Sequence, residues 1–106
     1  MSMHRCKITV LKRNYNQELA DMYLSDPTFG PCEILEEGQE FILDRDAFWR
    51  MPQGFCAEAW DAISRYVYVQ ISGGTVLENW MKYDKVAIAC CSDGIRPVIF
   101  KLEQLD

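Results

Sequence analysis

Hydrophobic and polar residues alternate at the start of the chain. Cys6, Ile8 and Val10 occupy every second position, and charged or polar residues such as Lys7 lie between them. Successive side chains of a strand point to opposite faces of its sheet. The alternation therefore predicts a strand with one buried face over residues 4–12.

A short helix is expected next. Asn14 and Gln17 have the spacing of a capping box, and Pro27 with the residue before it disfavours continued helix. We therefore expect a helix over about residues 15–24. Its apolar residues recur at helical spacing: Leu19, Met22 and Tyr23.

The middle of the chain has a weaker pattern. Residues 33–35 and 39–43 are short apolar runs on either side of Glu37-Gly38, which indicates two strands about a turn. Residues 44–52 mix charged residues with large apolar ones, which indicates a packed loop or a single helical turn. Its large apolar residues are Phe48, Trp49 and Met51.

The clearest helical pattern begins near Gly54 and ends at Gly73-Gly74, because glycine readily adopts the left-handed conformation that ends a helix. If Gly54 caps this helix, Cys56 lies in its first turn. The apolar stripe is Cys56, Trp60, Ile63, Val67 and Ile71.

A hairpin is expected at the end of the chain, with strands over residues 85–91 and 97–103 and a turn at Ser92-Asp93-Gly94. The first strand is apolar on both faces, so we expect it in the centre of the sheet, covered on both sides. Its small-residue face suits packing against the long helix. Its other face is left for a second layer or a partner subunit, which predicts a homodimer.

Together these elements predict a single α+β domain over residues 1–106, with an antiparallel sheet of four or five strands, one long helix and one short helix. The chain of 106 residues is 49% hydrophobic and 12% aromatic, which argues against disorder. Its length leaves no room for a second domain.

Charge and the absence of targeting patterns narrow the function classes. Eleven basic and sixteen acidic residues leave a net charge of −5, the wrong sign for a general nucleic-acid binder. No stretch resembles a secretion signal or the roughly 18–20 apolar residues of a membrane span. We therefore expect a cytoplasmic protein without a membrane partner.

Five cysteines are the compositional oddity. A reducing cytoplasm disfavours structural disulfides, and no C-x-x-C pair of the kind used by zinc and iron–sulfur sites is present. We therefore predict no cofactor and no metal ligands, while a zinc or iron site remains the alternative if the thiols converge in space. The cysteines are Cys6, Cys32, Cys56, Cys90 and Cys91.

Several short motifs together resemble a known family. They are Arg5-Cys6-Lys7-Ile8-Thr9-Val10, Gly30-Pro31-Cys32, Glu37-Gly38-Gln39-Glu40-Phe41, Gly54-Phe55-Cys56, Gly73-Gly74 and Cys90-Cys91-Ser92-Asp93-Gly94 with Arg96-Pro97-Val98. The motifs span nearly the whole chain. In them the chain resembles a family of small uncharacterised prokaryotic proteins, sometimes labelled an uncharacterised repeat protein. The resemblance implies a free-standing cytoplasmic domain of a bacterium or archaeon, and it carries over no activity, cofactor or catalytic residue.

Cys56 is the first candidate for chemistry, because a thiol at a helix start is placed to be stabilised as a thiolate. The competing interpretation is that it only begins the apolar stripe and is packed. Cys90 is expected in the core, and Cys91 is expected under a helix or at the end of its strand. Arg96, beside the Asp93-Gly94 turn, is a candidate clamp for a carboxylate or phosphate, or else a solvated partner of Asp93.

Two functional hypotheses follow. The leading one is a non-enzymatic binding or interaction domain, homodimeric, with a pocket between the long helix and the hairpin, Trp60 as a wall and Arg96 as the polar anchor. The ligand is unknown. The alternative is a redox or metal-binding protein that uses Cys56 with Cys32 or Cys91.

Overall fold

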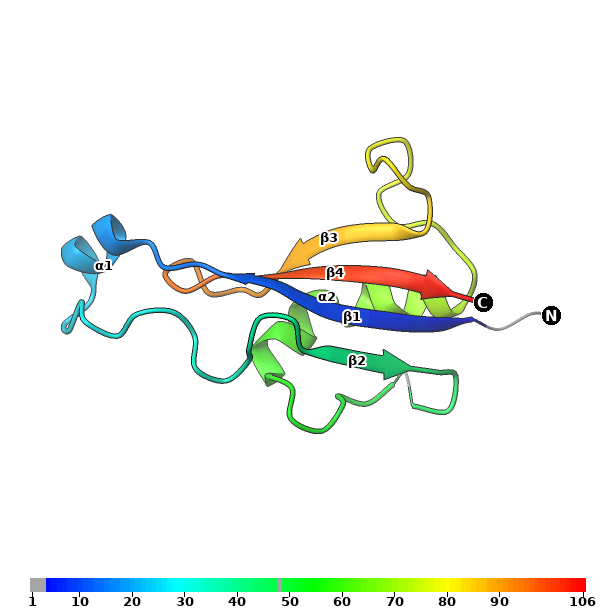
Figure 1. Ribbon diagram of the computed structural model, residues 1–106, viewed down its shortest axis with the longest axis horizontal. Helices are drawn as coiled ribbons and strands as arrows, with labels where there is room; N and C mark the ends of the chain where they lie inside the picture. Colours follow the sequence, from blue (N-terminus) through cyan, green and yellow to red (C-terminus); the bar gives the residue numbers. More distant parts are fainter. Residues whose placement is uncertain (1–3, 48) are drawn as a thin grey trace.

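A computed structural model describes residues 4–47 and 49–106. Its sheet has four antiparallel strands in the order β2-β1-β4-β3, and helix α2 lies against one face (Figure 1). The predicted α+β class is thereby confirmed. The elements are β1 (Arg5–Arg13), α1 (Gln17–Tyr23), β2 (Glu40–Leu43), α2 (Ala57–Ile71), β3 (Val86–Cys90) and β4 (Val98–Leu105).

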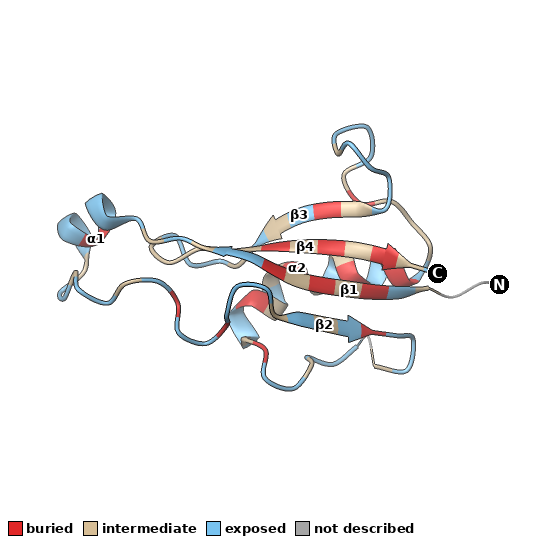
Figure 2. Ribbon diagram, in the orientation of Figure 1, coloured by how far each residue is buried: buried red, intermediate tan, exposed pale blue. Residues whose placement is uncertain are grey.

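The alternation in β1 is confirmed, because Cys6, Ile8 and Val10 are all buried. They pair in register with β4, whose Phe100 and Leu102 are also fully buried (Figure 2). These two central strands form the sheet side of the core. A register shift between Val10 and Lys12 marks a bulge near the end of β1.

The face of the sheet away from α2 carries charge instead of a second layer. Lys7 on β1 lies 3.7 Å from Glu40 on β2 and 3.8 Å from Glu103 on β4. Lys101 lies 3.2 Å from the same Glu103 carboxylate. These alternating charges make the central part of this face a surface suited to water.

Helix α2 begins two residues later than expected. Its N-cap is Cys56, not Gly54, whose φ of 84° instead turns the chain into the helix. Phe55 before the cap packs edge-on against Trp60, with ring centroids 6.2 Å apart. This contact across the first turn is a hydrophobic staple, and it fixes the angle at which the chain enters α2.

The end of α2 lies where the glycine pair predicts it. The Gly74 N–H donates to Val69 O and the Gly73 N–H to Gln70 O, the paired bonds of a Schellman motif. The inner face of the helix is buried against the sheet. Its buried residues are Ala59, Ile63, Val67, Gln70 and Ile71.

The segment 33–35 is not a strand, which corrects the sequence-based expectation. Its backbone bends around Cys32, whose carbonyl accepts a hydrogen bond from Arg13 Nη1 at 2.8 Å, and only Leu35 turns into the core. In the stretch 44–52, Phe48 lies outside the described residues. Trp49 is 63% exposed, with the Arg50 guanidinium 5.8 Å from its ring centroid.

Strand β3 is an edge strand, so the prediction that it lies in the centre of the sheet is wrong. Its small-residue face does turn toward α2, with Ala87 fully buried and Ala89 partly so. Its other face is open, and Cys90 is exposed there rather than in the core. The alanines make one face apolar because they fit close under α2. The apolar residues of the other face are not covered by a second layer within the part of the chain that the structure describes.

Helix α1 lies on an arm that extends away from the sheet (Figure 1). Its N-cap is Asn16, and the Asn16 side chain donates to Gly94 O instead of capping the helix, so the expected Asn14 capping box does not form. The apolar stripe faces solvent, with Met22 70% and Tyr23 72% exposed. Within residues 4–47 and 49–106, neither helix has the length and apolar character needed to cross a membrane.

Candidate functional site

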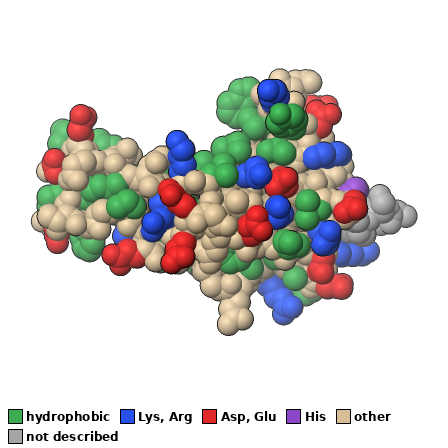
Figure 3. Space-filling view, viewed as in Figure 1, with side chains coloured by type: hydrophobic (Ala, Val, Ile, Leu, Met, Phe, Trp, Pro, Cys, Tyr) green, Lys and Arg blue, Asp and Glu red, His purple; other side chains and the backbone are tan. Residues whose placement is uncertain are grey.

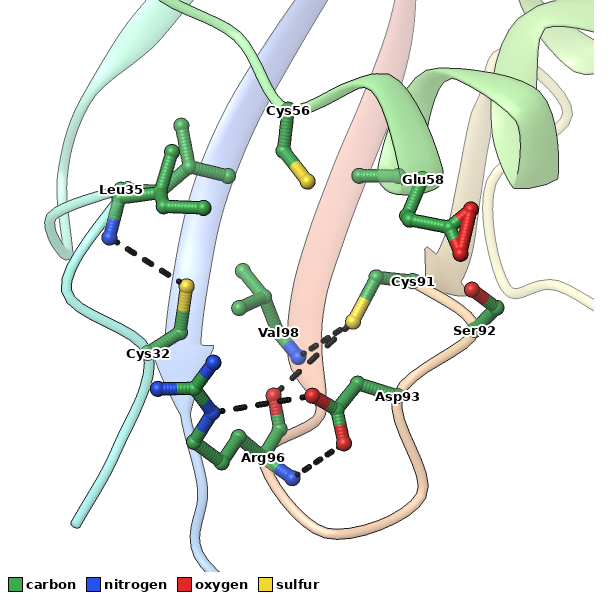
Figure 4. A pocket seen from close by; sticks show the side chains of 11 residues that line it. Cys32, Leu35, Cys56, Glu58, Cys91, Ser92, Asp93, Arg96 and Val98 are labelled. Carbon is green, nitrogen blue, oxygen red and sulfur yellow. Dashed lines mark hydrogen bonds and ion pairs between the residues drawn. The ribbon is translucent and has the colours of Figure 1, made fainter. Parts of the chain in front are cut away.

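A cavity of about 280 Å³ lies where three distant segments of the chain meet. They are the bend at residues 32–35, the first turn of α2 and the loop between β3 and β4 (Figure 4). The lining residues are Cys32, Ile34, Leu35, Cys56, Glu58, Ala59, Cys91, Ser92, Asp93, Arg96 and Val98. Most of these side chains are apolar or thiols, and three are charged.

Asp93 holds the loop between β3 and β4 in shape. Its Oδ1 accepts the backbone N–H groups of Ile95 at 2.8 Å and Arg96 at 2.9 Å. The hydrogen bond from the Arg96 N–H, followed by that from Ile95 and the Arg96 charge, lowers the pKa of Asp93. The carboxylate is therefore ionised and committed to the loop.

Arg96 is the cation of the cavity. Its Nε lies 3.7 Å from Asp93 Oδ2, and its side chain is 32% exposed. From this contact the side chain extends toward Cys32, and one of its two terminal nitrogens points up between Cys32 and Val98 (Figure 4). Asp93 thus orients the guanidinium from one side, at the wall of the cavity.

The sulfurs of Cys32 and Cys91 are held by the backbone. Cys91 Sγ accepts the Val98 N–H at 3.3 Å and lies 4.0 Å from Arg96 O, and Cys32 Sγ accepts the Ile34 N–H at 3.4 Å. Both residues thus help to shape their own loops.

Cys56 differs from these two thiols. It is the N-cap of α2, its carbonyl accepts the Trp60 N–H at 2.9 Å, and its side chain points into the cavity (Figure 4). It therefore presents its sulfur to any molecule in the cavity.

The other two thiols lie elsewhere. Cys6 is buried under α2 and Cys90 is exposed on β3. All five cysteines are free thiols. Among the residues that the structure describes, no group of three or more His, Cys, Asp or Glu side chains is placed to hold a metal ion.

Four of the five residues named from the sequence therefore line one cavity: Cys32, Cys56, Cys91 and Arg96. Trp60 is not a lining residue, because its ring is held by the staple contact with Phe55. The hydrophobic spacing predicts that Trp60 lies on the apolar face of the helix, but it does not predict the contact with Phe55. Sequence reasoning missed Leu35 and Val98 as walls, since each reads as an ordinary core residue.

Comparison of the chain with family models, with curated proteins and with solved structures found no match. The resemblance to the small prokaryotic family stays a prediction.

Proposed function

We propose that the protein is a small binding domain, without a reaction of its own, that holds a small molecule in the cavity beside α2. One observation carries this proposal. An oriented guanidinium, that of Arg96, lies at the wall of a cavity whose other walls are mainly apolar side chains and thiols. Few polar groups in a largely apolar hollow are the usual composition of a ligand site.

The ligand class follows from the walls. A guanidinium binds carboxylate or phosphate oxygens through charge-assisted hydrogen bonds. Leu35, Ala59 and Val98 supply apolar surface for the rest of the molecule. The cavity of about 280 Å³ limits the ligand to a small one. We therefore assign a small apolar molecule that ends in an anionic group.

Titrations with hexanoate, butyl phosphate and hexan-1-ol test this assignment. We expect either anion to shift the backbone amide NMR signals of residues around the cavity, with the uncharged alcohol binding at least about tenfold more weakly because it offers no charge to Arg96. R96A should abolish the preference for the anions. Its amide spectrum also shows whether the loop still folds, since the backbone N–H of residue 96 keeps its bond to Asp93.

The matched control is R65A, which removes an exposed arginine of α2 that does not line the cavity. Its titrations should match those of the unmodified protein. Equal binding of anions and alcohol, or an R65A effect as large as that of R96A, would contradict the assignment.

A second candidate function is thiol chemistry, as a redox or metal-binding protein centred on Cys56. The observation that favours it is the meeting of Cys32, Cys56 and Cys91 at one cavity, although they are far apart in the sequence. A thiol at the N-cap also lies near the positive end of the helix dipole.

Native thiol titration with an aromatic disulfide reagent, together with zinc and iron analysis, separates the two candidates. The binding-domain proposal expects slow reaction at all five thiols and no stoichiometric metal. A fast thiol that disappears in C56S, or one bound metal per chain, would favour the second candidate instead.

The binding-domain proposal also includes an oligomeric state and a cellular location. We propose a homodimer, supported by apolar side chains in solvent near β3, among them Trp80 at 72% and Ile88 at 39% exposure. We propose the cytoplasm of a prokaryote as its location, supported by five free thiols, which suit a reducing compartment.

A further inference from the structure

The free edge of β3 lacks the features that normally protect an edge strand. The strand reads Val86-Ala87-Ile88-Ala89-Cys90 and contains no charged residue, no proline and no bulge. The opposite edge, β2, is one residue shorter and begins with the charged Glu40. Unprotected apolar edges pair readily with another strand, so proteins leave one open where a partner covers it.

The backbone of β3 presents its hydrogen-bonding groups to that edge at known positions. The register pairs Val86 with Glu103, and the Gln104 N–H donates to Lys85 O while the Cys91 N–H donates to Val98 O. Odd-numbered residues therefore bond to β4, and the even-numbered ones direct their N–H and C=O groups outward. Among the described residues, only the Val86 N–H finds a partner on that side, Tyr83 O at 3.2 Å.

The outward groups are complementary to themselves. If two β3 strands run antiparallel about Ile88, each Ile88 N–H donates to the partner's Ile88 carbonyl. Each Cys90 N–H then meets the partner's Val86 carbonyl. The N–H of Val86 is already bonded to Tyr83 O within its own chain. Only this register uses all three even-numbered residues of both strands, which is why a second copy suits the edge.

The surroundings of the edge fit the same occupant. A groove of about 480 Å³ runs beside it, lined by β3, by α2 and by the loop that carries Trp80. Figure 3 shows hydrophobic side chains gathered on this loop, above β3 in the view. Two non-glycine residues of the loop, Leu77 at φ 57° and Asn79 at φ 65°, hold left-handed conformations beside the exposed Trp80. Such backbone strain is concentrated at functional surfaces.

The charges of the groove also permit self-association. Asp61 and Arg65 both line it on the α2 side. A surface that carries one acid and one base can face its own copy without a conflict of like charges.

From these observations we infer that two copies join edge to edge through β3, antiparallel about Ile88, to form one continuous eight-stranded sheet. This inference rests on the homodimer of the proposed function and specifies its interface. Val86 of each chain then lies opposite the partner's Cys90, on the open face of the sheet.

A cysteine cross-link tests the register. In an antiparallel hydrogen-bonded pair the Cα atoms lie about 5.5 Å apart, within the range that a disulfide spans. V86C with glutathione disulfide should therefore form a covalent dimer, as two protein thiols are oxidised and the glutathione disulfide is reduced to two thiols. Within one chain residues 86 and 90 lie about 13 Å apart, so the link forms only between chains.

V86C/C90S removes the partner thiol and should lose the cross-link, and the unmodified protein should not form it. I88K should weaken the dimer at least tenfold in sedimentation equilibrium, because it brings two charges together at the centre of the interface. The matched control is I42K on the other edge, where Ile42 is 54% exposed, and it should leave the dimer intact.

The outcomes distinguish the two proposals. A monomer at every concentration would overturn the homodimer itself and this interface with it. A stable dimer that V86C does not cross-link, or that I88K leaves unchanged, would overturn the β3 interface alone.

Discussion

At the scale of single residues, the least expected interaction is a buried polar pair beneath α2. Cys6 Sγ donates to Gln70 Oε1 at 3.0 Å, and Gln70 Nε2 donates to Leu102 O at 2.9 Å. Gln70 thus connects the helix to β1 and β4 at once. Burial, with the nearby Glu103 charge, raises the pKa of Cys6 to about 12, so this thiol is neutral and inert at physiological pH.

The raised pKa of Cys6 predicts a loss of stability in alkali. In the folded state the Cys6 thiol keeps its proton up to about pH 12, whereas in the unfolded state it loses the proton near pH 9.0. The contribution of the protonated thiol to the free energy of unfolding is therefore fully present below pH 9. As the pH rises from 9 toward 12, the free energy of unfolding should fall by up to about 1.4 kcal/mol per pH unit from this group.

Urea unfolding between pH 8 and 11 measures this slope. C6S keeps a hydroxyl donor for Gln70 but removes the titration, so its slope should be shallower than that of the unmodified protein. C90S alters an exposed thiol and serves as the control, with the slope of the unmodified protein. Parallel slopes for C6S and the unmodified protein would contradict the account.

The candidate site shows where prediction from sequence stops at this scale. Asp93-Gly94 predicts the loop, because aspartate accepts backbone N–H groups two and three residues on. The sequence offers the meeting of Cys32, Cys56 and Cys91 only as an alternative, because it depends on how three segments pack after the sheet and helix have formed.

At the scale of elements, long patterns predicted well and short ones did not. The stripe of α2 and the alternation in β1 extend over enough residues to fix both the type of element and its buried face. The three apolar residues at 33–35 form a run too short to separate a strand from a bend with one buried side chain. The edge position of β3 depends on sheet order, which no local pattern encodes.

The end of α2 gives a prediction at this scale. G73A should lower the free energy of unfolding by about 1–2 kcal/mol, because φ is 88° and an L-residue is strained there. The added Cβ would also lie 3.3 Å from the His4 ring. Urea unfolding of G94A is the control, since a Cβ there meets nothing within 4 Å. Equal losses in both variants would show that the left-handed position is not the cause.

At the scale of the whole molecule, the shape is elongated. The principal extents are 51 × 31 × 20 Å, and the radius of gyration is 14.9 Å against about 13 Å for a compact chain of this length. The arm that carries α1 accounts for this shape (Figure 1). Hydrogen bonds fix it to the sheet end, including the Asn14 N–H to Pro97 O and the Asn16 N–H to Ile95 O, both below 3 Å.

The core and the arm should therefore contribute unequally to stability. No helix or strand packs against α1 within the described residues, and Met22 and Tyr23 are mostly in solvent. M22A/Y23A should change the free energy of unfolding by no more than about 0.5 kcal/mol, the usual range for surface substitutions. I63A removes a fully buried side chain of α2 and should cost about 2–5 kcal/mol. If the arm variant loses as much stability as I63A in urea unfolding, the arm folds back onto the body in solution.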